Sequence, residues 1–223
     1  MCGRFTLRSP IEAISGRFNV SPNLLESLRP RYNIAPSEMC LTVVSAGGNI
    51  SPESMEWGFI GKSQKSERSF RLINSRADKL IGIPRFLTSL QYRRCLVVAD
   101  GFYEWQKNAS KEGPTYYQLQ DSSPFAFAGI WAYGLAPSGS KVKRFSIITT
   151  EANSLVGQTH DRMPAILSEE SEGLWLDQSR QNYLGLLSML IPFPSGSMKG
   201  YKVSNVVNRS GIDDKKAVNP ITK

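Results

Sequence analysis

Short segments of β-strand character recur along the whole chain, and this pattern limits the possible folds more than any other feature of the sequence. They are rich in β-branched and aromatic residues, and turn-forming residues separate them. No regular alternation of strand and helix accompanies them, so a parallel βαβ sheet is not indicated. The pattern favours an α+β domain built mainly on antiparallel, barrel-like sheet. The expected strands cover residues 5–7, 40–44, 55–59, 95–99, 102–105, 115–119, 125–133 and 145–149.

The segments between these strands predict short helices and turns. Residues 11–18 have a helical pattern, with Ser9 as the cap and Pro10 at the first position. Asp100-Gly101 has the composition of a hairpin turn between two of the strands. We also expect helices at residues 21–25, 84–92, 169–176 and 182–190, an irregular segment at 31–37, a polar surface loop at 61–69 and a polar tail at 209–223.

Length and charge bound the class of protein. The chain has 223 residues, of which 40 % are hydrophobic, and this is enough for one domain with a substantial core. It contains no apolar run long enough to span a membrane and no recognisable signal peptide, so we expect a cytoplasmic protein. The net charge of +8 makes a polyanion the natural class of partner.

The cysteines argue against a zinc site and against a disulfide framework. Cys2, Cys40 and Cys95 lie far apart in the sequence and lack the CxxC spacing of zinc ligands. Cys40 and Cys95 fall in apolar segments, and we expect them in the core. The sequence therefore predicts no metal and no cofactor.

Cys2 has a different potential, because removal of Met1 would make it the amino terminus. The product would carry an amine and a thiol on adjacent carbons. An α-amine has a pKa of about 7.7 to 8.0, so a useful fraction is neutral at pH 7. Such an amine attacks an aldehyde, and the thiol can then close a five-membered thiazolidine ring. Many chains have a small residue at position 2, but the strand expected at residues 5–7 would also pin this terminus inside the fold.

Other polar residues could transfer protons or bind anions. Glu104 lies between two aromatic residues, where burial would raise its pKa towards neutrality, although a solvent-facing glutamate is the simpler interpretation. His160 is the only histidine and lies in a polar segment, where histidines are more often structural than catalytic. Asn74 and Arg76 lie at a strand-to-helix junction and could bind an anion there, but helix capping alone would explain Asn74.

Several motifs occur in order along the chain and carry a resemblance to a known family. They are Met1-Cys2-Gly3-Arg4-Phe5, Arg31-Tyr32-Asn33-Ile34-Ala35-Pro36, Asn74-Ser75-Arg76-Ala77, Ala99-Asp100-Gly101-Phe102-Tyr103-Glu104-Trp105, Ile147-Ile148-Thr149-Thr150-Glu151-Ala152-Asn153 and His160-Asp161-Arg162-Met163-Pro164. Together they closely resemble the SRAP family, the SOS-response-associated peptidase or abasic-site processing proteins. The resemblance covers nearly the whole chain, from Cys2 to about Asn208.

The resemblance implies a single α+β SRAP domain over residues 1–208 that binds single-stranded DNA. Such a domain captures abasic sites as a covalent, thiazolidine-linked DNA–protein crosslink. By matching motif, Cys2 would be the nucleophile and Asn74 would position its amine. Glu104 and His160 would be the pair that transfers protons, with the division of roles between them open. Whether Met1 is removed by the protein itself or by an aminopeptidase is also open.

The resemblance also implies the partner and the residues that would contact it. Arg4, Arg76 and Arg162 lie inside the motifs and are candidate phosphate ligands, although each could equally be an ordinary surface or salt-bridging arginine. The expected partner is single-stranded DNA that contains abasic sites, with no membrane and no metal involved. We expect a monomer, associated with the nucleoid of a prokaryote.

The chain departs from the family at one motif, and two other functions stay open. Many members have a proline and a tryptophan after the Trp-Gly pair, thought to wedge against DNA, whereas Trp57-Gly58 is followed here by Phe59 and Ile60, which would have to substitute. Ser75 and Asp78 also replace commoner residues. The other functions are an N-terminal-cysteine peptidase, with activity that could be confined to removing its own Met1, and a noncatalytic single-strand binder.

Overall fold

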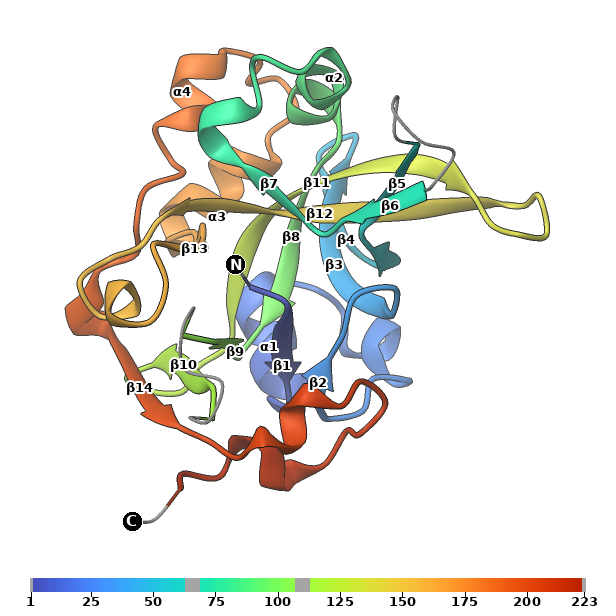
Figure 1. Ribbon diagram of the computed structural model, residues 1–223. Helices are drawn as coiled ribbons and strands as arrows, with labels where there is room; N and C mark the ends of the chain where they lie inside the picture. Colours follow the sequence, from blue (N-terminus) through green and yellow to red (C-terminus); the bar gives the residue numbers. More distant parts are fainter. Residues whose placement is uncertain (1, 63–68, 107–112, 222–223) are drawn as a thin grey trace.

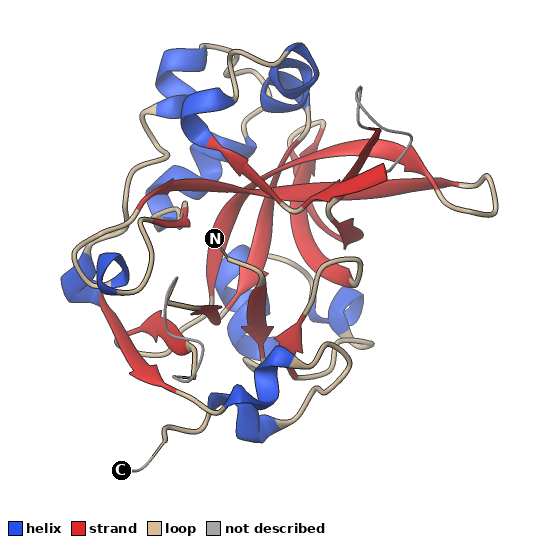
Figure 2. Cartoon of the chain, in the orientation of Figure 1, coloured by secondary structure: helices blue, strands red, loops and turns tan. Residues whose placement is uncertain are grey.

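The computed structural model describes residues 2–62, 69–106 and 113–221, with strands in the middle of the molecule (Figure 1). Helices lie mainly around the strands, at the periphery (Figure 2). Within the described residues, the strands form one large sheet, one five-stranded sheet and one two-stranded ribbon. No helix in these ranges is long and apolar enough to cross a membrane.

The large sheet closes on itself into a barrel. Its strands follow the order β11-β8-β3-β4-β12, and pairing of β12 with β11 completes the circle. Neighbouring strands are antiparallel, except that β12 runs parallel to β4 and to β7. This mainly antiparallel barrel with short helices confirms the predicted α+β class. The strands are β3 (Met39–Ala46), β4 (Asn49–Trp57), β7 (Asn74–Arg76), β8 (Arg94–Ala99), β11 (Phe125–Leu135), β12 (Lys141–Glu151) and β13 (Arg162–Pro164).

The five-stranded sheet carries the N-terminal strand between two neighbours. Its order is β14-β10-β9-β1-β2, so that β1 pairs with β9 on one side and with β2 on the other. Its strands are β1 (Arg4–Leu7), β2 (Arg31–Ile34), β9 (Gly101–Glu104), β10 (Thr115–Leu119) and β14 (Met198–Lys202). The separate ribbon consists of β5 (Phe59–Lys62) and β6 (Ser69–Leu72).

Phe5 joins the N-terminal strand to the core of the barrel. Its ring packs edge-on against Trp57 and Phe127, with 5.1 Å and 5.9 Å between ring centroids. All three side chains are fully buried. Burying a phenylalanine side chain contributes roughly 1.5 to 3 kcal/mol. The strand expected at residues 5–7 is therefore confirmed, and it fixes the N-terminal segment inside the fold.

The helices are short, and most of the expected ones are found. Those at residues 84–92 and 169–176 are confirmed, whereas the one expected at 182–190 is shorter and the one at 21–25 is a 3-10 turn. The α-helices are α1 (Ile11–Phe18), α2 (Pro84–Tyr92), α3 (Glu169–Leu176) and α4 (Tyr183–Leu187). The 3-10 helices are η1 (Pro22–Leu25), η2 (Ala77–Lys79), η3 (Val156–Gln158), η4 (Ser195–Ser197), η5 (Asn205–Asn208) and η6 (Lys215–Val218).

The predicted hairpin at Asp100-Gly101 and the predicted cap at Ser9 are both wrong. β8 pairs with β3 and β11 in the barrel, whereas β9 pairs with β1 and β10 in the other sheet. The chain therefore crosses between sheets at Asp100. The buried Asp100 carboxylate requires donors, and the Ser9 hydroxyl is one of them, at 2.9 Å, so it does not cap α1.

The last part of the chain packs against the strand β2. Residues 31–34, expected to be irregular, form this edge strand. The Asp213 carboxylate accepts hydrogen bonds from the backbone N–H groups of Tyr32 at 2.5 Å and Asn33 at 2.8 Å. Ala217 and Val218 are buried. The segment expected as a polar tail therefore lies on the sheet as far as the structure describes it, whereas most of the loop expected at 61–69 falls outside the described residues.

Candidate active site

Cys2 is fully buried at the entry to β1. Its backbone carbonyl accepts a hydrogen bond from Asn74 Nδ2 at 2.8 Å, and its thiol contacts the carbonyl oxygen of Arg4 at 3.5 Å. In Figure 1 the N-terminal end of the chain lies near the centre of the molecule, just below β12. The residue that would become the reactive terminus is thus held inside the fold.

Asn74 reaches Cys2 from the barrel. It lies on β7, opposite Ile147 of β12. The capping interpretation of Asn74 is wrong, because η2 begins at Ala77 without a side-chain cap. Asn74 Oδ1 is buried and accepts no hydrogen bond within the described part of the chain. The side chain therefore holds the Cys2 backbone through its nitrogen and offers an acceptor through its oxygen.

Glu104 is a buried carboxyl group at the end of β9. Burial raises its pKa from 4.5 to about 7, because the surroundings disfavour the charged form. The negative charge of Asp161 acts in the same direction. The solvent-facing interpretation of Glu104 is therefore wrong, and the carboxyl group titrates in the range useful for proton transfer.

The Cys2 thiol is held in its protonated form. Burial raises the pKa of this thiol, and the negative charge of Glu104 raises it further. Because the thiolate is the nucleophilic form of cysteine, the thiol is a poor first nucleophile at neutral pH. In a chain without Met1, the amine of Cys2 would be the group that attacks first.

The loop that carries His160 is organised by Asn153. Asn153 Oδ1 accepts hydrogen bonds from the N–H groups of Leu155 at 3.1 Å and Val156 at 2.9 Å, and Asn153 Nδ2 donates to the carbonyl oxygen of Phe193 at 2.7 Å. The N–H of His160 in turn donates to the Val156 carbonyl at 3.0 Å. These bonds fix the path of the loop and the start of the segment that follows it.

The His160 ring has two polar contacts at one nitrogen. Its Nδ1 lies 3.0 Å from the backbone N–H of Arg162, which suits a neutral ring that accepts a hydrogen bond. The same atom lies 2.8 Å from the Asp161 carboxylate, which suits a protonated ring that donates one. Both contacts orient the ring through Nδ1.

The structure brings together three of the predicted site residues directly and connects the fourth through a neighbour. Asn74 contacts Cys2, and the charge of Glu104 acts on the Cys2 thiol. The charge of Asp161 acts on Glu104, and the Asp161 carboxylate contacts His160. Both sheets contribute: Cys2 leads into β1 and Glu104 ends β9 of the five-stranded sheet, while Asn74 and the His160 loop adjoin β12.

Arg76 and Arg162 lie close together on the barrel side of the site. Both line a pocket of about 230 Å³ together with Asp78. Arg76 makes a two-point ion pair with Asp78, at 2.8 and 3.0 Å, and both side chains are about half exposed. Burial lowers the pKa of Arg162, and the positive charge of Arg76 lowers it further. Asp78 also lies 3.9 Å from Arg162 Nη1, so this carboxylate offsets part of the positive charge of both arginines.

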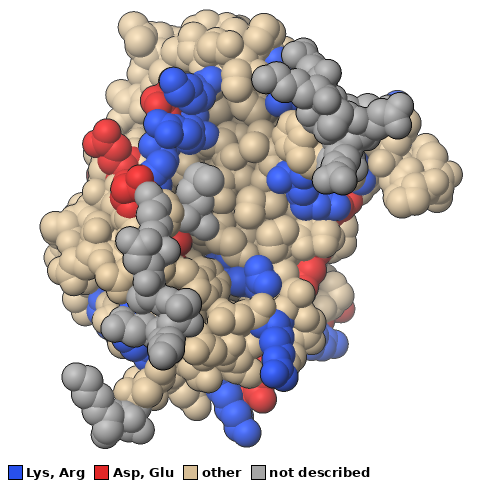
Figure 3. Space-filling view, viewed as in Figure 1, with Lys and Arg blue, Asp and Glu red and all other residues tan. Residues whose placement is uncertain are grey.

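Arg4 is the first residue of β1 and lies two positions after Cys2. Its Nη1 donates to the Gly3 carbonyl at 2.9 Å, while its buried Nε has no hydrogen-bond partner among the described residues. Burial lowers the pKa of Arg4. In Figure 3 lysine and arginine side chains lie on either side of the recessed middle of this face. The face thus presents positive charge around a hollow.

Sequence reasoning missed Asp161 and Tyr117. The Tyr117 hydroxyl lies 2.6 Å from Thr159 Oγ1, next to His160, and burial together with the charge of Glu104 raises the pKa of Tyr117. Asp161 was identifiable as a carboxylate adjacent to the only histidine, whereas nothing local in the sequence connects Tyr117 with the site. No group of three or more His, Cys, Asp or Glu residues in the described ranges could hold a metal ion.

Comparison with known families and proteins agrees with these observations. Residues 1–210 match the family described as SOS response associated peptidase (SRAP). The chain belongs to the SRAP family. The resemblance inferred from the motifs is therefore confirmed over nearly the whole chain.

Relatives of the chain carry a common name. The abasic site processing protein YoqW of Bacillus subtilis is 39 % identical over 211 residues, which cover 93 % of this chain and 94 % of that protein. The abasic site processing protein YedK of Escherichia coli is 30 % identical over 151 residues, which cover 66 % of this chain and 65 % of that protein. A crystal structure of a protein from Bacteroides thetaiotaomicron, 25 % identical, superposes with a TM-score of 0.82 and covers 99 % of this chain and 100 % of that one.

Proposed function

We propose that this protein processes abasic sites in single-stranded DNA by forming a covalent thiazolidine crosslink through Cys2, once Met1 has been removed. The observation that carries the proposal is the placement of Cys2, which is buried, held by Asn74 and influenced by the charge of Glu104. Related proteins named for abasic site processing support the choice of substrate.

The chemistry follows from an aldehyde meeting two nucleophiles. The neutral amine of Cys2 adds to C1′ of the open deoxyribose, and loss of one water gives an imine. The thiol then adds to the imine carbon, and its proton passes to the nitrogen. The product is a five-membered ring that joins C1′ to both the nitrogen and the sulfur of Cys2, with one water released overall.

The neighbouring groups supply the proton transfers that this sequence requires. An abasic sugar is mostly a closed hemiacetal, so opening it needs a base at the 1′ hydroxyl and an acid at the ring oxygen. The carboxyl group of Glu104, with a pKa of about 7, exists in both forms near neutrality. His160 is the second candidate for these transfers, and its two contacts at Nδ1 orient the ring. Asn74 Oδ1 would accept a hydrogen bond from the Cys2 amine and orient it for attack.

The arginines would hold the strand through its phosphates. Arg76 and Arg162 share a pocket, Arg76 follows Asn74 on β7, and Arg4 follows Cys2 by two residues, so all three are candidates for contacts to phosphates near the reacting position. Contacts of this kind fix the position of a strand without reading its sequence. Binding is therefore expected to depend on salt and to tolerate any flanking bases.

The proposal is tested by mixing protein that lacks Met1 with a single-stranded oligonucleotide that contains one abasic site. We expect an adduct that survives denaturation and whose mass equals protein plus oligonucleotide minus one water. The intact oligonucleotide should give no adduct. Salt-dependent binding of both oligonucleotides with no covalent product would instead indicate a simple single-strand binder, and cleavage of peptides without DNA would indicate a peptidase.

The phosphate contacts make a separate prediction about salt. Each phosphate contact to a single strand contributes about 0.7 to the slope of log affinity against log salt concentration. Arg162→Gln is therefore expected to lower that slope by about 0.7 and to weaken binding equally for all sequences. Fluorescence anisotropy across a salt series measures this slope. Arg180→Gln is the control, because Arg180 pairs with Asp177 outside the pocket and should leave the slope unchanged.

A further inference from the structure

We propose that Thr6 and Asp100 form a positioning unit that sets the register of β1 and thereby places Cys2 beside Glu104. This inference rests on the proposed function, because it concerns the same reaction. Neither residue contacts Cys2 in the structure, so both would act through the strand that carries it.

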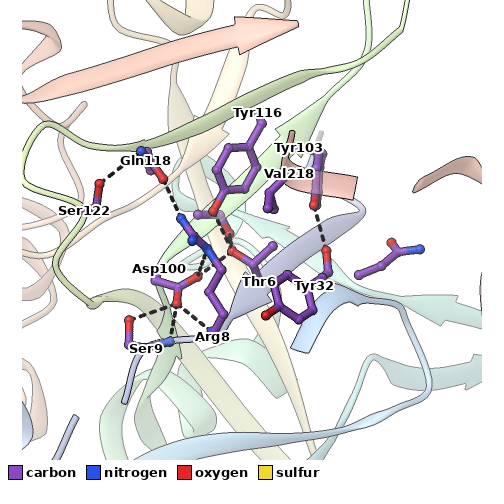
Figure 4. A network of polar contacts seen from close by, with 12 residues as sticks. Thr6, Arg8, Ser9, Tyr32, Asp100, Tyr103, Tyr116, Gln118, Ser122 and Val218 are labelled. Atoms are coloured by element: carbon purple, nitrogen blue, oxygen red, sulfur yellow. Dashed lines mark hydrogen bonds and ion pairs between the residues drawn. The ribbon is translucent and has the colours of Figure 1, made fainter. Parts of the chain in front are cut away.

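The Asp100 carboxylate is the centre of this unit (Figure 4). Its Oδ1 accepts a hydrogen bond from the Thr6 hydroxyl at 2.5 Å. Its Oδ2 accepts from the backbone N–H groups of Arg8 at 2.6 Å and Ser9 at 2.7 Å, and from the Ser9 hydroxyl at 2.9 Å. The backbone N–H of Asp100 also donates to the Thr6 carbonyl at 3.0 Å. One residue thus holds three positions at the end of β1.

The unit is extended into the neighbouring strand by Tyr116. The Tyr116 hydroxyl lies 2.9 Å from Thr6 Oγ1, and both side chains are fully buried. Gly101 leaves room for this ring, because a Cβ at that position would lie only 2.1 Å from the Tyr116 hydroxyl. Arg8 completes the contact with β10, since its Nη2 donates to Gln118 Oε1 at 3.0 Å. The end of β1 is therefore tied to β10 as well as to the start of β9.

The register of β1 decides where Cys2 lies. Arg4 is opposite Tyr103 and Thr6 is opposite Gly101, so the chain that precedes Arg4 runs towards Glu104. A shift of one residue would turn every side chain of a strand to the opposite face. The strand has only four residues, and Cys2 lies beyond its pairing end. Specific bonds at the far end of the strand are therefore needed to prevent such a shift.

Two groups thus hold the nucleophile from opposite ends. The Asn74 amide binds the Cys2 carbonyl at the entry to β1, and the Asp100 carboxylate binds the residues at its exit. A carboxylate bonded by several donors is well suited to this task, because hydrogen bonds to a charged acceptor are about twice as strong as neutral ones. Asp100 immediately precedes β9, so the same residue also fixes the strand that ends in Glu104.

The inference is tested with Thr6→Val and Thr6→Ser in protein that lacks Met1. Valine keeps the shape of threonine but removes the hydroxyl, and serine restores it. Under single-turnover conditions with abasic oligonucleotide, we expect Thr6→Val to lower the maximal rate of crosslinking about 10- to 100-fold, as a misplacement of about 1 Å does. The apparent Kd for the oligonucleotide should change less than about 2-fold, since the phosphate contacts remain. Thr6→Ser should recover most of the rate.

A control separates positioning from general loss of stability. Leu186→Ala removes a buried side chain of α4, away from β1, and should lower the midpoint of thermal unfolding while the folded protein keeps the wild-type rate. If Thr6→Val is folded and reacts at the wild-type rate, or if Leu186→Ala is slowed as much, the inference is wrong. If Thr6→Val does not fold, Tyr116→Phe serves instead, and a wild-type rate for it has the same meaning. Failure of the wild-type protein to crosslink would refute the proposed function, whereas the outcomes above refute only the positioning role.

Discussion

Cys2→Ala is expected to form no stable crosslink with abasic DNA, which is the largest effect that the proposed mechanism predicts. The variant retains an α-amine and can still form an imine, but it has no thiol to close the ring. A free imine at C1′ makes the neighbouring proton acidic and promotes loss of the 3′ phosphate. The variant should therefore cleave the strand slowly where the wild-type protein captures it.

Borohydride distinguishes the two roles of Cys2. Reduction converts an imine into a secondary amine, so Cys2→Ala should give an adduct with borohydride and none without it, as seen on a denaturing gel. Wild-type protein should give an adduct under both conditions, and protein that keeps Met1 should give none without borohydride, because its terminal residue has no thiol to close the ring. A stable adduct of Cys2→Ala without reductant would contradict the assignment of Cys2 as the double nucleophile.

Glu104→Gln is expected to slow crosslinking about 10²- to 10⁴-fold near neutral pH, the usual effect of removing a general acid or base. Because the pKa of Glu104 is raised to about 7, its carboxylate form disappears as the pH falls through that value. If the carboxylate acts as the base, the wild-type rate falls below about pH 7. In Glu104→Gln this inflection should be absent, leaving the titration of the amine at a pKa of about 8. Single-turnover rates measured from about pH 5.5 to about pH 9 give both profiles.

Stability against pH provides an independent measurement of the same group. A carboxyl group whose pKa is raised on folding binds its proton more tightly in the folded state. Its favourable contribution is complete below about pH 4.5 and is lost as the pH rises through about 7. Glu104→Gln should therefore gain stability over the wild-type protein on going from pH 5 to pH 8, by roughly 3 kcal/mol at most. Equal pH dependence of unfolding for the two proteins would mean that Glu104 is not buried as described.

Local sequence patterns predicted the helices and strands of this fold better than they predicted which strands pair. The apolar segment at 95–99 and the helices at 84–92 and 169–176 were identified because each has the right periodicity and length. The pairing around Asp100 was misread, because an Asp-Gly pair looks the same in a hairpin and at a crossover between sheets. The crossover is stabilised by hydrogen bonds from residues 6–9 to the buried Asp100 carboxylate, and these donors lie far from Asp100 in the sequence.

The candidate site shows the same difference between what local patterns predict and what tertiary contacts decide. Cys2 could be proposed from its chemistry as an aminothiol, whereas for Glu104 the residues alone favoured a solvent-facing side chain and the family resemblance suggested its role. For Asn74 the residues alone were explained by a helix cap, and only the family motif predicted that it positions the Cys2 amine. The hydrogen bond from Asn74 to the Cys2 carbonyl depends on β7 joining β12, a parallel contact that no local pattern announces. Tyr117 likewise lies next to His160 because of a tertiary contact, the one between its hydroxyl and Thr159, and not because of a local sequence pattern.

The division of the site between two sheets has a consequence for the order in which the molecule becomes active. Cys2 is the earliest of these residues to leave the ribosome, whereas β12 and the His160 loop come from the second half of the chain. Until those later strands have joined the barrel, the terminus has neither the Asn74 amide nor the loop that carries His160 in place. If the proposed mechanism holds, a growing or truncated polypeptide would react with aldehydes no faster than a free cysteine, and rapid attachment to DNA would be confined to completed molecules.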